Sequence, residues 1–113
     1  MRVPRADFAR IDPAKVRDYL LSPSHPVGRF KAAFFGALGY TQENWRRLEN
    51  DLLSMIRSKG AVPGQPSAYG QKYEVRGTLV GPSGRQAQIL AVWIILPGED
   101  FPRFVTAFPG ERR

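Results

Sequence analysis

The stretch that decides the fold is Lys72-Tyr73-Glu74-Val75-Arg76-Gly77-Thr78-Leu79-Val80, followed by Gly81-Pro82-Ser83-Gly84 and then by the run from Gln86 to Leu96. Apolar and polar residues alternate in the first segment, which predicts a strand with one buried face. The Gly-Pro-Ser-Gly segment predicts a turn. The run 86–96 is apolar on both faces and predicts a central strand that is partly covered on both sides. With a last strand at 103–109, this half of the chain predicts an antiparallel meander.

Three helices are expected before this sheet. Asp12-Pro13 predicts the capped start of a short helix that ends near Leu21 and has Tyr19 on its inner side. A second helix is expected to begin between His25 and Arg29 and to end at Gly39. Its apolar residues at helical spacing, expected to face the core, are Phe30, Ala33, Phe34, Ala37 and Leu38.

The third helix is expected after a Thr41 cap, and its apolar stripe consists of Trp45, Leu48, Leu52, Met55 and Ile56. Helices that precede strands in this way predict an α+β domain. We expect three N-terminal helices packed on one face of a small antiparallel meander of three to four strands. Residues 1–10 are interpreted as a flexible lead-in and residues 11–110 as a single domain.

Composition narrows the possible chemistry. The 113 residues contain 17 Lys and Arg against 10 Asp and Glu, a formal net charge of +7, with no cysteine and one histidine. Thiolate chemistry and disulfides are thereby excluded, and a protein-made zinc site, a metal centre or another cofactor is not expected. No apolar run approaches the ~20 residues that span a bilayer, so we expect no membrane partner and a cytoplasmic location. The positive charge favours polyanions as partners, either RNA or an acidic protein.

The segment from Ser24 to Phe35 is a candidate site because basic residues stand where they oppose helix formation. Arg29 and Lys31 lie at the start of the second helix, whose dipole disfavours cations there. Conflicts of this kind are expected at functional sites. His25 stands beside them and is the side chain suited to proton transfer near neutral pH. We expect the neighbouring cations to favour its neutral form, which suits a base, although a histidine at a helix start can also be a cap.

A second group of candidates lies on the polar face of the sheet. Lys72, Arg76 and Thr78 are separated by even numbers of residues and so share this face, and the last strand can add Arg103 or Thr106, depending on its register. Cations and hydroxyls on one face suit a phosphodiester, and fixed cations stabilise the dianion that forms when a 2′-hydroxyl attacks its phosphate. A merely solvated face is the alternative. Tyr69, in the loop before the first long strand, is a candidate for stacking on a base.

Several segments resemble an uncharacterised family of short bacterial domains, and the resemblance extends from about Ile11 to Pro109. The segments are Leu20 to Ala32, Tyr69-Gly70-Gln71-Lys72-Tyr73 and Arg103-Phe104-Val105-Thr106-Ala107-Phe108-Pro109. Members of that family occur as small proteins and at the ends of larger toxin-like chains. The resemblance therefore implies a toxin of a toxin and antitoxin pair.

The layout of helices followed by a sheet is also similar to metal-independent ribonuclease toxins of the barnase, EndoU, colicin and RelE type. That similarity implies His25 or Lys31 as acid or base and Thr106 as a helper in catalysis. It implies phosphate binding by Lys72, Arg76 and Arg103, and Arg29 and Tyr69 complete the expected substrate-binding set.

From the sequence we therefore expect an RNA-cleaving toxin that acts without a metal, by 2′-hydroxyl attack, and that an acidic antitoxin neutralises. The alternative is a non-catalytic module that binds nucleic acid or an acidic partner through the same basic face. Whether the protein is an enzyme stays open at this point, as does its oligomeric state.

Overall fold

The structure is a computed structural model, which describes residues 1–110. Its elements, in chain order, are η1 (Ala6–Phe8), α1 (Pro13–Lys15), the π-helical turn η2 (Val16–Leu20), α2 (Arg29–Ala37), α3 (Trp45–Ser58), β1 (Ala61–Pro63), β2 (Gln71–Val80), β3 (Gln86–Ile95) and β4 (Arg103–Pro109). The expected order of helices before strands is confirmed, and the fold is α+β.

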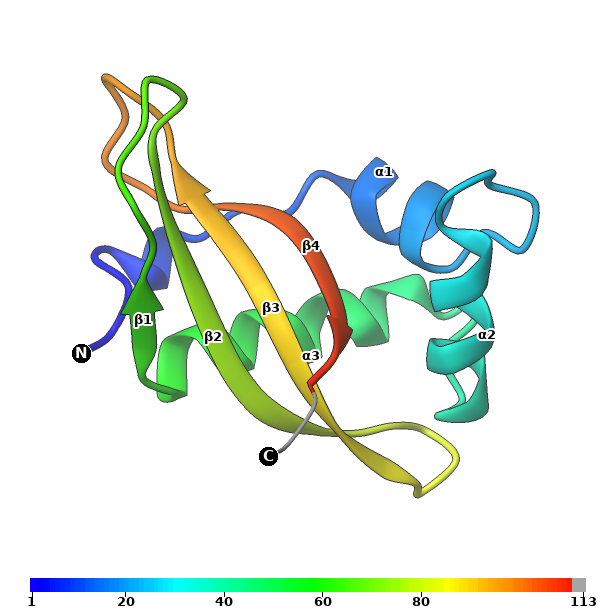
Figure 1. Ribbon diagram of the computed structural model, residues 1–113. Coiled ribbons are helices and arrows are strands. Elements are labelled where there is room, and N and C mark those ends of the chain that lie inside the picture. The colour runs from blue at the N-terminus through cyan, green and yellow to red at the C-terminus, as the bar shows by residue number, and fades with distance from the viewer. Residues whose placement is uncertain (111–113) are drawn as a thin grey trace.

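The four strands form one antiparallel sheet in the order β1-β2-β3-β4 (Figure 1). Its three long strands lie where the sequence predicts them, and β1 is a short additional strand from the loop after α3. The register shifts between Val92 and Trp93, so that Val92 pairs with Thr106 while Trp93 pairs with Phe104. Val105 is the extra residue of this irregularity, and it bends the edge strand β4.

The core lies between α3 and one face of the sheet (Figure 1). Leu48, Leu52, Met55 and Ile56 of α3 are buried, which confirms the predicted stripe of that helix. The hydroxyl of Thr41 accepts a hydrogen bond from the amide of Asn44 at 3.2 Å, and the Asn44 side chain accepts one from the amide of Thr41 at 2.7 Å. These bonds close the turn before α3, whose N-cap residue is Asn44, so the helix begins later than the Thr41 cap predicts.

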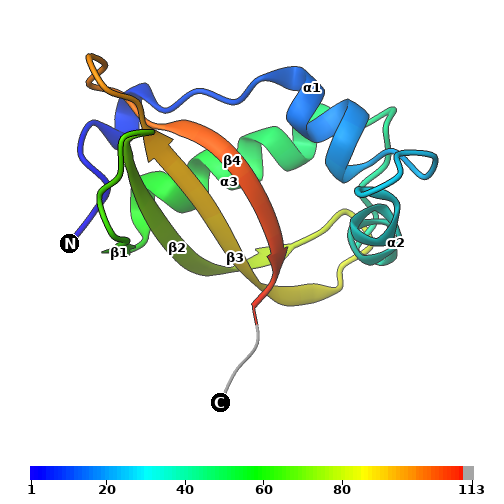
Figure 2. The same ribbon diagram turned by 45° about the horizontal axis from the view of Figure 1, so that its top comes forward.

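The elements α1, η2 and α2 lie beside the β4 edge of the sheet, whereas α3 crosses behind its strands (Figure 2). The Asp12 side chain caps α1 by accepting the Ala14 amide at 3.0 Å, as expected. In η2 the Leu21 amide donates to the carbonyl of Val16, five residues earlier, at 3.0 Å. This wider turn is a π-type bond, and such turns are frequent at functional sites.

The inner face of α2 differs from the sequence prediction. Phe30, which was expected in the core, is 70% exposed, whereas Phe35 is fully buried at 0% exposure. Ala33 and Ala37 are exposed as well. The helix is thus rotated by about one residue, or ~100°. This rotation turns Lys31, which lies four residues before Phe35, toward the rest of the domain.

Residues 1–10, suggested by sequence as a flexible lead-in, lie against the domain. Val3, Ala6 and Ala9 are buried in the core. Arg10 forms a parallel bridge with Arg103: its amide donates to the Pro102 carbonyl and its carbonyl accepts the Phe104 amide, both at 2.9 Å. Within residues 1–110, no helix combines the length and apolar character needed to cross a membrane.

The buried Tyr40 predicts a loss of stability at alkaline pH. Its hydroxyl donates to Asp51 Oδ2 at 2.6 Å, and burial, that hydrogen bond and the Asp51 charge raise the pKa of the phenol far above its ordinary value. The folded protein keeps the proton that the unfolded chain loses near pH 10, so stability is complete below about pH 10 and falls above it by up to ~1.4 kcal/mol per pH unit. We expect urea unfolding of Tyr40→Phe to lack this part of the alkaline loss. An equal alkaline loss of unfolding free energy in the wild type and in Tyr40→Phe would contradict this prediction.

Candidate functional site

Three polar side chains from different elements meet at the β4 edge of the sheet. Lys31 Nζ, from α2, donates to the Tyr19 hydroxyl of η2 at 2.7 Å and to Thr106 Oγ1 of β4 at 2.8 Å. The two hydroxyl oxygens are 3.4 Å apart. Lys31 Nζ also lies 5.0 Å from the centre of the Tyr19 ring and 5.5 Å from that of Phe108. An ammonium held by two hydroxyls keeps a third N–H for a ligand.

Backbone geometry fixes the positions of these groups. The rotation of α2 turns Lys31 inward, and the irregularity at Val105 places Thr106 opposite Val92, on the face of the sheet away from α3. Gly28 lets the chain before α2 approach η2 closely, because a Cβ at this position would lie only 2.0 Å from the carbonyl oxygen of Tyr19. The site is therefore built by the packing of α2, η2 and β4 against one another.

His25 closes the turn before α2 and contacts Tyr19. Its Nδ1 accepts the amides of Val27 at 3.0 Å and Gly28 at 2.9 Å. The ring packs edge-on against the Tyr19 ring, with centroids 5.1 Å apart. Because Nδ1 carries the accepting lone pair, the proton of the neutral ring is assigned to Nε2. In this arrangement His25 can donate a hydrogen bond, whereas the base role expected from the sequence would require the hydrogen bonds from the Val27 and Gly28 amides to break.

These residues line a pocket of about 560 Å³, whose walls are formed by Lys15, Tyr19, His25, Val27, Val105 and Thr106. Val27 is 64% exposed at its mouth. The pocket thus combines apolar walls with polar groups from Tyr19, His25 and Thr106. Lys31 donates hydrogen bonds to two of these groups, and the combination is typical of ligand sites.

The environment of Tyr19 shifts its acidity. Partial burial acts to raise the pKa of the phenol, but the hydrogen bonds from Lys31 and Thr106 and the charges of Lys31 and Lys15 outweigh it. The pKa of Tyr19 therefore lies below its ordinary value. A phenol with a lowered pKa, hydrogen-bonded to a cation at the wall of a pocket, is a candidate proton-transfer group.

The structure brings the three predicted catalytic residues, His25, Lys31 and Thr106, to one place and adds Tyr19. The sequence placed Tyr19 among the core residues, because it falls at helical spacing with Val16 and Leu20. No sequence pattern marks the π-type turn that carries it. Lys31, however, was marked by the charge conflict at the start of α2.

The predicted phosphate-binding residues are more dispersed. Lys72 and Arg76 are exposed on the sheet face that carries Thr106, where Arg76 is opposite Leu90 and Leu90 is opposite Phe108. At about 4.8 Å per strand, Arg76 lies two strands or ~10 Å from Phe108. Arg103 shares this face but forms a bidentate pair with Glu99, at 2.8 Å for both contacts.

Arg29 and Tyr69 lie apart from the cluster. The Arg29 guanidinium packs over the Phe30 ring at 4.5 Å and donates to the Pro26 carbonyl, at the outer side of α2. Tyr69 is 80% exposed in the loop before β2. That loop lies at the end of the sheet far from α2 (Figure 1).

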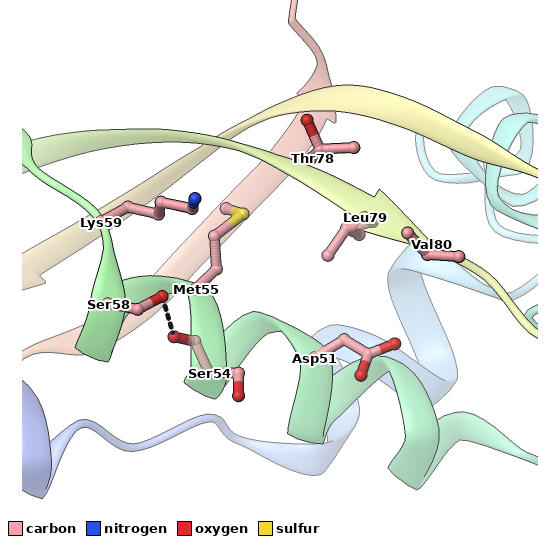
Figure 3. Close-up of a pocket in the computed structure, with 8 residues that line it drawn as sticks. All are labelled: Asp51, Ser54, Met55, Ser58, Lys59, Thr78, Leu79 and Val80. Atoms are coloured by element: carbon pink, nitrogen blue, oxygen red, sulfur yellow. Dashed lines mark hydrogen bonds between the residues drawn. The ribbon is translucent and has the colours of Figure 1, made fainter.

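Another hollow, of about 220 Å³, lies between α3 and β2 (Figure 3). Its polar groups are largely occupied by the fold. Ser58 Oγ donates to the Ser54 carbonyl at 2.8 Å, and the Asp51 carboxylate accepts from Tyr40 and pairs with Arg47 at 3.4 Å. Lys59 is the remaining cation, and no second proton-transfer group faces it in the close-up. Across residues 1–110, no three His, Cys, Asp or Glu side chains are arranged to hold a metal ion.

Comparison with known proteins identifies the family and the fold. No curated protein matches the sequence. A solved structure described as a contact-dependent growth inhibition toxin–immunity protein complex from Klebsiella pneumoniae 342 contains a similar chain, with a TM-score of 0.72 and 19% sequence identity over 96% of this chain and 98% of that chain. At this level of sequence identity, the structural similarity shows that the two chains share a fold. The model of a domain of unknown function, DUF6883, matches residues 2–111, and the protein therefore belongs to the DUF6883 family.

Proposed function

We propose that this protein is an RNA-cleaving toxin that acts without a metal ion, by attack of a 2′-hydroxyl on the adjacent phosphate. The observation that carries this proposal is the Lys31–Tyr19–Thr106 cluster beside a pocket that His25 and Lys15 also line. Phosphodiester cleavage of this kind needs one group that takes a proton, one that gives a proton, and cations that stabilise the dianionic intermediate. The cluster offers each of them within hydrogen-bond distance of the others.

In the proposed reaction Tyr19 accepts one proton and Lys31 donates one, and both groups return to their starting protonation states. Tyr19, as phenolate, takes the proton of the 2′-hydroxyl as the O2′–P bond forms. The Lys31 ammonium gives a proton to the 5′-oxygen as the P–O5′ bond breaks, which leaves a 2′,3′-cyclic phosphate and a 5′-hydroxyl. The proton then passes from the Tyr19 hydroxyl to the Lys31 amine across their 2.7 Å hydrogen bond, which restores both groups.

Other residues of the pocket act on the phosphate in this proposal. The Nε2–H of His25 donates to a non-bridging oxygen, and Lys15 adds positive charge. The Thr106 hydroxyl orients Lys31. Lys72 and Arg76, on the adjoining face of the sheet, attract the remainder of the RNA through their charge.

The toxin role and the protein partner rest on fold and charge. The structural neighbour belongs to a complex described as a toxin with its immunity protein. A net charge of +7 suits an acidic partner that covers the basic face and keeps RNA away from the pocket. The RNA substrate puts the site of action in the cytoplasm. The second candidate function, a non-catalytic module, shares the charge but gives no reason for the Lys31–Tyr19 pair.

The test is to incubate the purified protein with total cellular RNA in excess EDTA and to map the new ends. We expect cleavage that persists in EDTA and leaves 2′,3′-cyclic phosphates, and no cleavage of a matched RNA with a single 2′-deoxy residue at the mapped site. His25→Asn retains a side-chain acceptor for the Val27 and Gly28 amides and removes the imidazole, so we expect a folded protein with activity lowered by about 10- to 100-fold. RNA that is bound but left intact would establish the non-catalytic module instead.

A further inference from the structure

A second pocket adjoins the candidate active site and shares a residue with it. This pocket, of about 390 Å³, is lined by three cations, Arg10, Lys15 and Arg103, by one carboxylate, Asp12, and by apolar residues that include Ile11 and Phe104. Lys15 also lines the pocket with Tyr19 and His25. The two pockets therefore lie on either side of one lysine side chain, along the β4 edge of the sheet.

The two arginines are held together by the fold. The parallel bridge between Arg10 and Arg103 places their backbones side by side. Their guanidinium groups both pack on the Phe101 ring, at 4.4 Å for Arg10 and 4.9 Å for Arg103. Stacking on an aromatic ring orients a guanidinium while leaving its in-plane N–H donors for other partners.

Carboxylates near the pocket do not neutralise all of its cations. Glu99 occupies two donors of Arg103, and the Asp12 carboxylate accepts the Ala14 amide at the start of α1. Among the residues that the structure describes, neither Arg10 nor Lys15 takes part in an ion pair. The three cations of the lining thus outnumber the carboxylates of Asp12 and Glu99, and the remaining positive charge raises the affinity of the pocket for an anion.

We propose that this pocket is a second phosphate subsite, which binds a phosphodiester of the same RNA strand adjacent to the one that is cleaved. The proposal deepens the proposed function and rests on it for the identity of the strand. Arg10 is the main ligand, Lys15 bridges the two phosphates, and Glu99 holds Arg103 in place with its remaining donors available. Arg103 and Thr106, one from each pocket, are three residues apart on β4, which is at most about 10 Å at ~3.3 Å per residue, so both pockets lie along one short stretch of β4.

The experiment is a binding cycle with oligonucleotides that cannot be cleaved because they carry 2′-deoxyribose. A dinucleotide with a single phosphodiester fills the first pocket alone, and two longer ligands add one phosphate on its 5′ or its 3′ side. NMR titration gives the dissociation constants for the wild type and for Arg10→Gln, which keeps the backbone bridge. Arg57→Gln, an equal charge change at the exposed C-terminal end of α3, is the matched control.

We expect one of the longer ligands to bind the wild type about tenfold more tightly than the dinucleotide does, and Arg10→Gln to abolish that gain while leaving dinucleotide binding unchanged. Arg57→Gln is expected to keep the gain. If Arg10→Gln weakens all three ligands equally, or none of them, the subsite is refuted. Because these ligands cannot be cut, the measured affinities do not depend on catalysis. A failure of RNA cleavage would overturn the proposed function, but the binding experiment would still test the subsite.

Discussion

Lys31→Met is expected to abolish RNA cleavage, lowering kcat by about 10³-fold or more. The substitution removes the proposed proton donor and a cation that stabilises the dianion, and groups of each kind contribute about 10² to 10⁴ in rate. Methionine suits the space because the Lys31 side chain lies over the Tyr19 and Phe108 rings, and a thioether packs well against aromatic rings. The folded state is therefore expected to persist, which a thermal melt followed by circular dichroism will check.

Lys59→Met is the matched control for this variant. Lys59 is exposed and lines the hollow between α3 and β2, so its loss changes net charge equally without touching the cluster. We expect its kcat to stay within about twofold of the wild type. A Lys31→Met protein that is folded and retains more than about a tenth of wild-type kcat would contradict the assigned role of Lys31.

Lys31 also shows how much of the candidate site can be predicted from the sequence. The charge conflict at the start of α2 marked the residue, but the helical pattern placed Phe30 inside and left Lys31 outside. A helix of 9 residues with phenylalanines at 30, 34 and 35 has two apolar stripes about one residue apart. The choice between them depends on the packing of Phe35 with Tyr40, whose rings lie 6.4 Å apart, and such tertiary contacts leave no periodic signal.

The strands were predicted with nearly their observed bounds, because alternation in β2 and the apolar run of β3 are strong local signals. The sequence of the last strand did not determine which of its side chains lie on the same face of the sheet. Strict alternation puts Arg103 and Thr106 on opposite faces, whereas the irregularity at Val105 places both on the face away from α3. A one-residue irregularity of this kind follows from the pairing with β3 and has no consistent signature in the sequence of β4 alone.

Tyr19 was missed for a related reason. Its spacing from Val16 and Leu20 predicts a core position in a regular α-helix, but the π-type bond from Leu21 to Val16 widens the turn. The side chain consequently lies half-buried beside Lys31. The sequence could thus indicate the polar residues of the site on α2 and β4, while the third element became visible only once the turn geometry was known.

Tyr19→Phe is expected to lower kcat by about 10²- to 10⁴-fold with little change in KM, because the phenol is proposed to move a proton and not to bind the substrate. The pH profile provides a second readout. The wild-type rate should rise with pH until it levels near the pKa of Tyr19, which lies below its ordinary value of about 10. The residual activity of Tyr19→Phe should lack that rise.

Tyr73→Phe supplies the control, since it removes a phenol hydroxyl from β2, a strand that does not line the pocket. It is expected to retain wild-type kcat and the wild-type pH profile. If Tyr19 had only a structural role, Tyr19→Phe would lower the stability of the protein but would leave the shape of the pH–rate profile unchanged. Loss of a packing contact does not remove a titrating group on which the rate depends. A Tyr19→Phe profile that still rises with pH in parallel with the wild type would therefore assign the base to another group. His25, freed from its hydrogen bonds to the Val27 and Gly28 amides, would be the next residue to test by the same measurement.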